Sequence, residues 1–319
     1  MKELLSLPLT ADTVAEYPDL SAALAACGCA GVEGIWGGED LAPVPRACRI
    51  GYHLTFWPDW VDFWNGDRAA LTAKFGGEAA WRSFYGGPEG RETLLRGFRA
   101  DLDRAVAWGA EYVVFHVSDV SIEEGYTYRW LHSDRQVLEA AAQCIQGMLE
   151  GRTGDFAFLV ENQWWPGFSF TAPEETKWLL DAIPWEKKGI MLDTGHLMNS
   201  NVKLQNQEEG AAWILSCLDR HGDLARYVKG LHLHQSVSGA YVRAHTGALP
   251  GDLPQDYIQR FCESYQHILQ IDTHSPWTSP AVRRVVDRVG PEWLVHELSC
   301  TGRADREEKV RTQRAALGR

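Results

Sequence analysis

Residues 188–199 read KGIMLDTGHLMN, and this stretch contains the transition on which the fold prediction depends. Residues 190–192 have the character of a short buried strand, and Asp193 and His196 follow it three positions apart. A lone aspartate at a strand end is most often a helix N-cap or a turn residue. The same pattern at other strands would instead indicate a binding site built from several strand ends.

Short apolar runs of this kind recur along nearly the whole chain and alternate with amphipathic helical stretches. That alternation is typical of parallel βαβ units. The expected strands are residues 4–9, 32–36, 49–56, 111–118, 156–162, 189–193, 228–234 and 293–298. The expected helices lie at 91–109, 132–151, 171–183, 207–222 and 253–270, and the charged tail 304–319 is either a solvated helix or frayed.

Eight strands with intervening helices and no linker-like tract predict one α/β domain over residues 1–319, a closed (β/α)8 TIM barrel. The alternative is an open doubly wound sheet, but no GxGxxG motif follows the first strand. Two long aromatic-rich βα loops, 57–90 and 163–172, are expected to overhang the catalytic mouth, and the connection 235–252 is also long.

Composition excludes several classes of function. The formal net charge of −12 disfavours nucleic acid as a partner, because such affinity is built largely from clustered Lys and Arg. No apolar run approaches the roughly 18 residues of a membrane span. Seven cysteines without a CxxC pair indicate reduced thiols and a cytoplasmic protein. A small-molecule substrate is therefore expected.

Polar residues stand at the carboxyl ends of six consecutive expected strands, which is where barrel enzymes keep their active sites. Burying several carboxylates together costs several kcal/mol per ion unless positive charge lies among them. Imidazoles and carboxylates that converge in this way predict a site for a divalent metal such as Zn, Mn, Fe or Co. We expect Gly195 to let the chain turn so that His196 faces the same cavity. The residues concerned are His53, His116, Glu161, Asp193, His196, His232, His234 and Glu297, with His245 in the loop after the seventh strand.

The period of two along a strand sorts some of these histidines. His296 neighbours Glu297 and should point to the other face, which makes it structural. His232 and His234 share a face, so parity leaves open which of them contacts the metal directly.

The segments FLVEN, IMLDTGH, KGLHLHQ, LVHEL and HTGALPG resemble the xylose isomerase-like TIM barrel superfamily over residues 49 to 298. That superfamily includes sugar isomerases and epimerases, the endonuclease IV-type apurinic-site nucleases (AP endonuclease family 2) and a cobamide-remodelling amidohydrolase branch. The resemblance implies that Glu161, Asp193, His232 and Glu297 hold the shared metal. It further implies that His53 and His116 hold an additional metal bridged by Glu161.

The resemblance also matches His196 and His245 to a third metal site of the nuclease branch. In that branch an aspartate stands where this chain has Arg243, and a guanidinium cannot bind a cation. A third metal is therefore disfavoured. His196, His234 and His245 remain candidates either to bind an additional metal or to contact the substrate. Zn is the expected metal, at one or two ions per chain, and Arg243 is expected to hold an anionic group of the substrate.

The aromatic residues of the two loops have two interpretations. Trp57, Trp60, Trp164 and Trp165 either pack as small local cores or form a wall for a partly apolar or flat substrate. Both interpretations stay open, and these four residues are the predicted substrate contacts together with Arg243.

The predicted function is a metal-dependent hydrolase of an amide or phosphoester in a small or medium-sized metabolite, with a cobamide-type substrate as the sharpest candidate. The alternative is a metal-dependent sugar isomerase or epimerase, in which Glu161 and Glu297 move protons beside a carbonyl group. An apurinic-site nuclease is less favoured because of the charge and Arg243. The candidate catalytic residues are Glu161, Glu297, His196 and Arg243.

Overall fold

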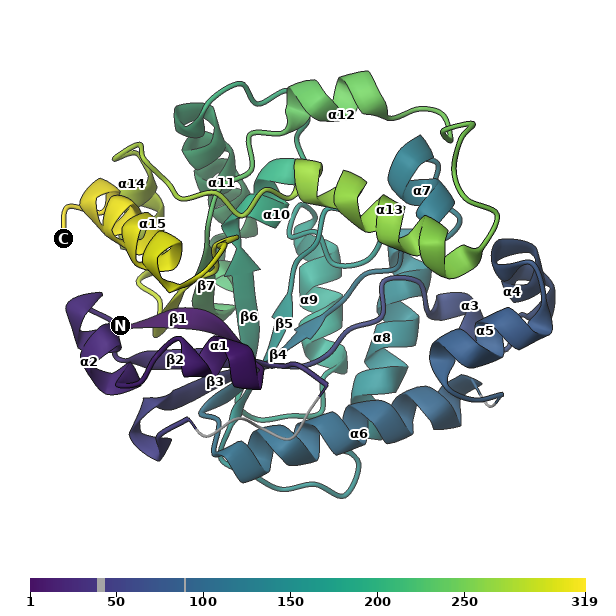
Figure 1. Ribbon diagram of the computed structural model, residues 1–319, viewed down its shortest axis with the longest axis horizontal. Helices are drawn as coiled ribbons and strands as arrows, with labels where there is room; N and C mark the ends of the chain where they lie inside the picture. The colour runs from purple at the N-terminus through teal and green to yellow at the C-terminus, as the bar shows by residue number, and fades with distance from the viewer. Residues whose placement is uncertain (39–43, 89) are drawn as a thin grey trace.

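The computed structural model describes residues 1–38, 44–88 and 90–319, and these form a closed barrel of eight parallel strands with helices outside it (Figure 1). The strands follow one another in chain order, and β1 pairs with β8 to close the barrel. The prediction of a (β/α)8 barrel is therefore confirmed. The strands are β1 (Lys2–Leu9), β2 (Gly31–Trp36), β3 (Arg49–His53), β4 (Tyr112–His116), β5 (Ala157–Glu161), β6 (Lys188–Asp193), β7 (Val228–Leu233) and β8 (Trp293–His296).

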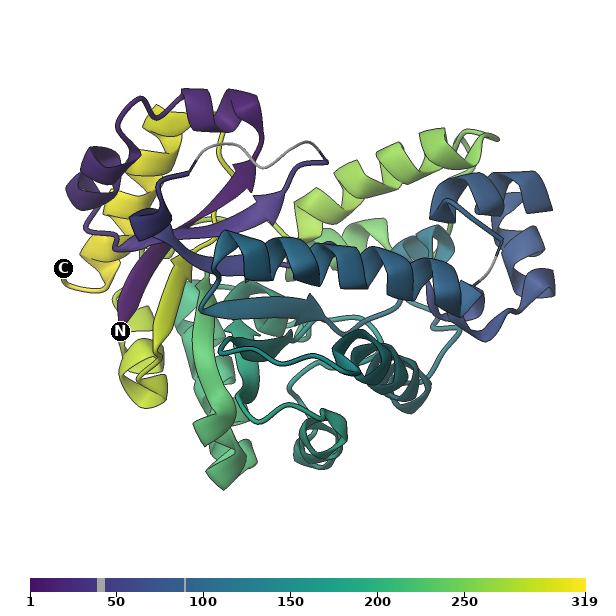
Figure 2. The same ribbon diagram turned by 90° about the horizontal axis from the view of Figure 1, so that it is seen from below.

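The longer helices lie close to the ranges expected from hydrophobic periodicity. They are α6 (Gly90–Trp108), α8 (Asp134–Leu149), α9 (Pro173–Ala182), α11 (Gln207–His221), α13 (Tyr257–Ile271) and α15 (Arg303–Ala316). Helix α15 is not frayed, because Val310 and Gln313 are buried and Arg314 Nε donates a hydrogen bond to Glu3 of β1 at 2.9 Å. The two termini consequently lie near each other (Figures 1 and 2).

Shorter helices occupy the connections. They are α1 (Ala11–Ala15), α2 (Leu20–Ala26), α3 (Val61–Asn65), α4 (Arg68–Phe75), α5 (Glu78–Tyr85), α7 (Ile122–Thr127), α10 (Thr194–Asn199), α12 (Gly239–His245) and α14 (Val282–Val289), with 3-10 helices at Arg46–Cys48 and Gly222–Tyr227. The expected long loop 57–90, of which residue 89 lies outside the described residues, thus contains α3, α4 and α5. In both views these helices stand on the side of the barrel away from the termini (Figures 1 and 2).

Because side chains alternate between the two faces of a strand, the register of each strand determines where its site residue lies. Val114, Leu159, Met191 and Val295 belong to one buried apolar cluster formed by strand residues. Two residues further along, and so on the same face, come His116, Glu161 and Asp193 at the ends of their strands and Glu297 directly after β8. An apolar layer of the barrel therefore gives way to a polar layer at the carboxyl ends of the strands.

Candidate metal and substrate site

Glu161, at the end of β5, is the hub of the polar layer. Its Oε2 lies 3.2 Å from His53 Nε2 and 3.4 Å from His116 Nε2. The same oxygen lies 3.2 Å from His232 Nδ1, and Oε1 lies 3.1 Å from His196 Nδ1. Four imidazoles, three from strands β3, β4 and β7 and one from α10 after β6, therefore meet around one buried carboxylate, as the sequence led us to expect for a metal site.

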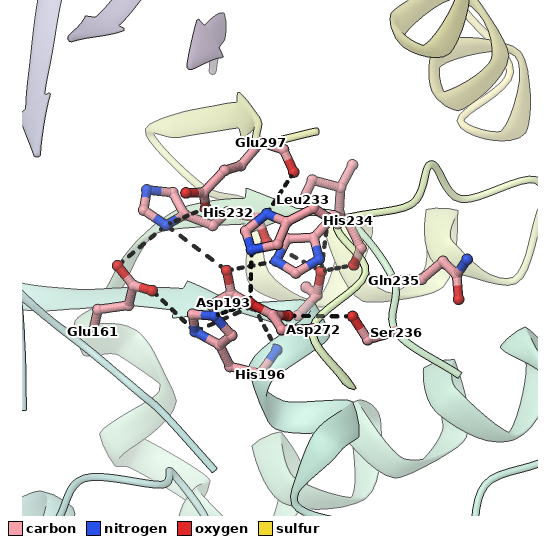
Figure 3. A network of polar contacts seen from close by, with 12 residues as sticks. Glu161, Asp193, His196, His232, Leu233, His234, Gln235, Ser236, Asp272 and Glu297 are labelled. Atoms are coloured by element: carbon pink, nitrogen blue, oxygen red, sulfur yellow. Dashed lines mark hydrogen bonds and ion pairs between the residues drawn. The ribbon is translucent and has the colours of Figure 1, made fainter. Parts of the chain in front are cut away.

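His232 lies between two carboxylates that face the same nitrogen. Its Nδ1 is 3.2 Å from Glu161 Oε2 and 2.9 Å from Glu297 Oε2, in the network drawn in Figure 3. Both His232 Nδ1 and Glu297 Oε2 are buried without a hydrogen-bond partner among the described residues. Asp193 Oδ2 lies 3.9 Å from the same nitrogen. A ring nitrogen with two or three carboxylates around it is a donor set for a divalent cation.

The other nitrogen of His232 is held by a residue that sequence reasoning missed. His232 Nε2 forms a hydrogen bond of 3.1 Å with Oε2 of Glu33, a fully buried carboxylate on β2, and lies 3.0 Å from Oε1. Tyr112 donates a hydrogen bond to Glu33 Oε2 at 2.8 Å. The sequence signal was a glutamate inside the apolar run GVEGIW, where a charged residue needs a partner.

Asp193 is both a helix N-cap and a member of the polar layer, whereas the sequence pattern favoured the metal-ligand role alone. Its Oδ1 accepts a hydrogen bond from the backbone N–H of His196 at 2.6 Å and so caps α10. Its Oδ2 lies 2.8 Å from His234 Nε2. The prediction that Gly195 makes a turn is wrong, because this residue is part of α10. A Cβ atom there would overlap the His234 ring, so the glycine makes room for the imidazole.

A second group of potential ligands adjoins the first. One nitrogen or oxygen atom from each of His196, His234, Asp272 and His274 lies within 4.8 Å of the others. Asp272 Oδ2 is 3.0 Å from His196 Nε2 and 2.7 Å from His274 Nε2. Asp272 and His274 were missed by sequence reasoning, although the pattern Asp-Thr-His between β7 and β8 is a recognisable signal.

Two predicted site residues do not join these groups. Arg243 and His245 lie on α12, where Arg243 donates to the backbone carbonyl of Val202 and the His245 ring contacts the carbonyl of Tyr241. Both side chains are exposed, and neither lines the cavity described below. Asp272 and His274, which lie in the same connection between β7 and β8, stand beside His196 instead.

The pKa values of His232 and Glu161 are shifted by opposite charges that lie close to each of them. Burial alone would lower the pKa of His232, but Glu297 and Glu33 raise it well above its usual value. Burial alone would raise the pKa of Glu161, but His116 and His232 bring it well below its usual value. These carboxylates therefore require positive charge among them, which protonated imidazoles or a divalent cation can supply.

The predicted aromatic contacts divide into two pairs. Trp164 and Trp165 follow Glu161 and line the cavity, with their ring centroids 4.0 Å apart. Trp57 and Trp60 do not line it. Trp57 packs against Phe84 and Tyr85 of α5, and Trp60 is buried with its Nε1–H donated to the carbonyl of Ser118 at 2.8 Å. For the first loop the interpretation as a local core therefore applies.

A cavity of about 580 Å³ opens above the polar layer. Among the residues that line it are six of the polar groups described above, which identifies it as the place where a small molecule would meet them: His53, His116, His196, Asp272, His274 and Glu297. Elsewhere, His296 faces away from this layer, as predicted, and contacts Glu3 and Gln313. No helix within the described ranges is long and apolar enough to cross a membrane.

Comparisons with known proteins give a consistent fold. A family model described as "Xylose isomerase-like TIM barrel" matches residues 21–317. Among solved structures, an L-ribulose 3-epimerase is 10% identical, with a TM-score of 0.52 over 98% of this chain and 93% of that chain. A D-allulose 3-epimerase from Methylomonas sp., in complex with D-allulose, is 10% identical, with a TM-score of 0.51 over 100% of this chain and 96% of that chain. A search of curated protein sequences found no match.

These comparisons correct the predicted function. Both of these solved structures are sugar 3-epimerases, so the prediction of a hydrolase acting on an amide or phosphoester, and on a cobamide-type substrate, is wrong. The alternative, a metal-dependent sugar isomerase or epimerase, agrees with the matches.

Proposed function

This chain belongs to the xylose isomerase-like TIM barrel family, and from that premise we propose that it is a metal-dependent isomerase or epimerase of a sugar-like hydroxy-carbonyl compound. The observation that carries the proposal is the position of His232 Nδ1 between Glu161 Oε2 and Glu297 Oε2. This nitrogen and Glu297 Oε2 have no hydrogen-bond partner within the described part of the chain. Their donor chemistry fits a divalent cation.

Glu161, His232 and Glu297 would hold that cation, with Asp193 and His53 as neighbouring donors. His53 Nδ1 lies 2.8 Å from the carbonyl of Leu54, so Nδ1 carries the hydrogen and Nε2 can present its lone pair toward Glu161. When bound, the cation would stabilise the negative charge that develops on the substrate's carbonyl oxygen. Zn²⁺ is our first candidate, and Mn²⁺, Fe²⁺ and Co²⁺ suit the same ligands.

Glu297 is the carboxylate best placed to move the proton. Its side chain is 16% exposed and lines the cavity, whereas Glu161 is 1% exposed and does not line it. Burial alone would raise the pKa of Glu297, but His232 lowers it, so the group is ionised and can accept a proton. Glu297 would take the proton from the carbon beside the carbonyl, the C–H electron pair would form a C=C bond, and the π pair of the C=O bond would pass to the carbonyl oxygen. Return of a proton to the opposite face gives an epimer, and return to the neighbouring carbon gives an isomer.

Glu161 faces the same nitrogen from another strand, and we propose it as the second proton carrier, acting through His116 and His196, which line the cavity. His116 and His196 contact its two oxygens, at 3.4 Å from Oε2 and 3.1 Å from Oε1. Gln163 Nε2 lies 3.0 Å from His196 Nδ1 and lines the cavity, so it also helps to orient that ring.

We further propose that the group of His196, His234, Asp272 and His274 holds a second cation. Three imidazoles and one carboxylate suit Zn²⁺ or another first-row metal. The buried His234 Nδ1, which has no hydrogen-bond partner in the described ranges, supports this assignment. His196 contacts Asp272 through Nε2 and Glu161 through Nδ1, so it connects the two sites.

The test is proton exchange with solvent. Protein loaded in turn with Zn²⁺, Mn²⁺ or Co²⁺ is incubated in D₂O with L-ribulose, D-allulose or D-tagatose, and the sugars are examined by NMR. An isomerase or epimerase that works by proton transfer through Glu297 should place deuterium on the carbon beside the carbonyl, and even slow exchange is detectable. Glu297→Gln should abolish the exchange, whereas Glu292→Gln, an exposed residue paired with Lys229 at 3.2 Å, should retain it. Absence of exchange with every metal, both with these sugars and with α-hydroxyketones that carry an alkyl chain, would refute the proposal.

A further inference from the structure

The cavity is longer than a single sugar unit requires. Helix α13 forms one of its walls from end to end, since Tyr257 at the first turn and Leu269 near the last turn both line it. Asp272 of the second ligand group follows the helix directly. Fifteen helical residues span about 22 Å at about 1.5 Å per residue. Figure 1 shows α13 crossing the barrel end, with α10 near its C-terminal end and α7 alongside.

The walls between these two ends are apolar. They come from the loop after β3, from the segment around α7, and from one face of α13: Phe56, Val120, Ile122, Phe261, Ile268 and Leu269. Phe56 is 51% exposed and its ring stacks on that of His116, with centroids 4.3 Å apart. The apolar wall therefore begins directly beside the metal-binding residues and is open to solvent there.

The far end of the cavity carries two polar atoms that lack partners. Asp59 Oδ2 and the Tyr257 hydroxyl are buried and have no hydrogen-bond partner within the described residues, and both side chains line the cavity. Asp59 Oδ1 is bound by Lys74 at 2.7 Å, and the Tyr257 ring stacks on neighbouring Phe75 at 3.9 Å. Burial raises the pKa of Tyr257, and the nearby charge of Asp59 raises it further.

We propose, building on the proposed function, that the substrate is an extended amphipathic molecule rather than a free sugar. Its hydroxy-carbonyl head lies at Glu297 and the metal-binding residues, and its apolar body lies along α13. Its far end carries a hydrogen-bond donor, a hydroxyl or an ammonium group, that contacts Asp59 Oδ2 and the Tyr257 hydroxyl.

Three physical arguments support this assignment. A cavity of this volume lies in the range of pockets that enclose a drug-sized ligand. A free sugar would leave the apolar wall beside α13 uncovered, whereas each buried methylene of an apolar body increases affinity about fourfold. A donor at the far end satisfies two buried acceptor-capable atoms, whose desolvation is otherwise uncompensated.

The test uses hydroxamates, whose head group binds divalent metals. Acetohydroxamate, butyrohydroxamate, hexanohydroxamate and octanohydroxamate are titrated calorimetrically into the Zn²⁺-loaded full-length protein. Affinity should rise about fourfold per added methylene. Ile268→Asn should flatten this dependence, whereas Ile258→Asn, a 53% exposed position on the same helix, should preserve it.

The far end is tested with the ω-amino derivatives of the longer hydroxamates, up to the dodecanoyl compound. At the length that reaches Asp59, the amino probe should bind at least tenfold more tightly than its methyl-ended counterpart. Asp59→Asn should remove that advantage. Tyr257→Phe, which keeps the ring stacked on Phe75, should reduce it while the fold stays intact.

The outcomes separate the inference from the proposed function. Equal affinity for all chain lengths would overturn the extended substrate and leave the metal site standing. An amino group without effect, or with the same effect in Asp59→Asn, would overturn the far-end contact. Failure of every hydroxamate to bind the metal-loaded protein would refute the metal site itself, and the extended substrate with it.

Discussion

Glu33 Oε2 lies 3.1 Å from His232 Nε2, and this hydrogen bond decides which nitrogen of His232 faces Glu161 and Glu297. The two residues are 199 positions apart in the chain and both are fully buried. With Nε2–H donated to Glu33, Nδ1 presents its lone pair between Glu161 and Glu297. A carboxylate behind a metal-binding imidazole fixes the ring and increases its basicity.

Replacing Glu33 should therefore weaken metal binding without removing any proposed ligand. Glu33→Gln keeps the side-chain volume but lets the carbonyl or the amide face His232, so the imidazole loses its fixed orientation. We expect a 10- to 100-fold lower affinity for Zn²⁺, measured by competition with a chromogenic chelator. Glu111→Gln, a surface position paired with Lys2 at 2.6 Å, is the control. Equal affinities for the two variants would contradict the role assigned to Glu33.

The second ligand group makes a prediction about metal stoichiometry. His274→Ala removes a ligand from the group of His196, His234 and Asp272, and elemental analysis should then find one fewer ion per chain. His245→Ala should leave the metal content unchanged, because His245 is exposed and remote from that group. A reversed result, with metal lost only in His245→Ala, would support the assignment based on the sequence RAH.

Gly195 should tolerate no side chain. A Cβ atom at this position would overlap the buried imidazole of His234, and overpacking of this kind costs about 1–3 kcal/mol. Gly195→Ala should lower the urea midpoint and weaken metal binding, since His234 must move. Gly97→Ala is the matched control, because a Cβ atom added there on α6 would meet nothing within 4 Å and a helical alanine is favoured over glycine. A Gly195→Ala protein as stable as the wild type would contradict the packing described here.

His132 predicts a dependence of stability on pH. Hydrogen bonds with Asp119 (2.9 Å) and then Asp62 (3.1 Å) raise its pKa to about 10. A raised histidine pKa contributes stability that is complete below the unfolded value, near 6.5, and is lost as pH rises toward about 10.

His132→Gln should accordingly lower the free energy of unfolding by about 2 kcal/mol at about pH 6. The difference from the wild type should shrink steadily as pH is raised to about 10, and urea denaturation at several pH values measures it. His245→Gln, which alters an exposed ring, should show no such trend. A difference that grows with pH would contradict the charged state assigned to His132.

The sequence by itself determined the barrel. Eight apolar runs of strand length, alternating with amphipathic helices, leave few ways to bury both faces of a parallel sheet. It also marked candidate residues at the ends of the expected strands, because strand boundaries are local. Glu161, Asp193, His232 and Glu297 stood out there, and the family resemblance implied that they hold one metal, whereas the period of two separated only His296 from this set.

Only the tertiary structure decided which distant groups complete the site. Glu33 meets His232 and Asp272 meets His196 through closure of the barrel and the path of the β7–β8 connection, and no local pattern encodes these distances. The same holds for Arg243, whose place on α12 turns it toward Val202. The tryptophans were also decided by tertiary structure. Trp60 fills a local core and Trp164 lines the cavity, but the sequence around a tryptophan looks the same in both cases. Local periodicity determines which residues share one face of a helix or strand. Long-range packing determines which distant residues that face contacts.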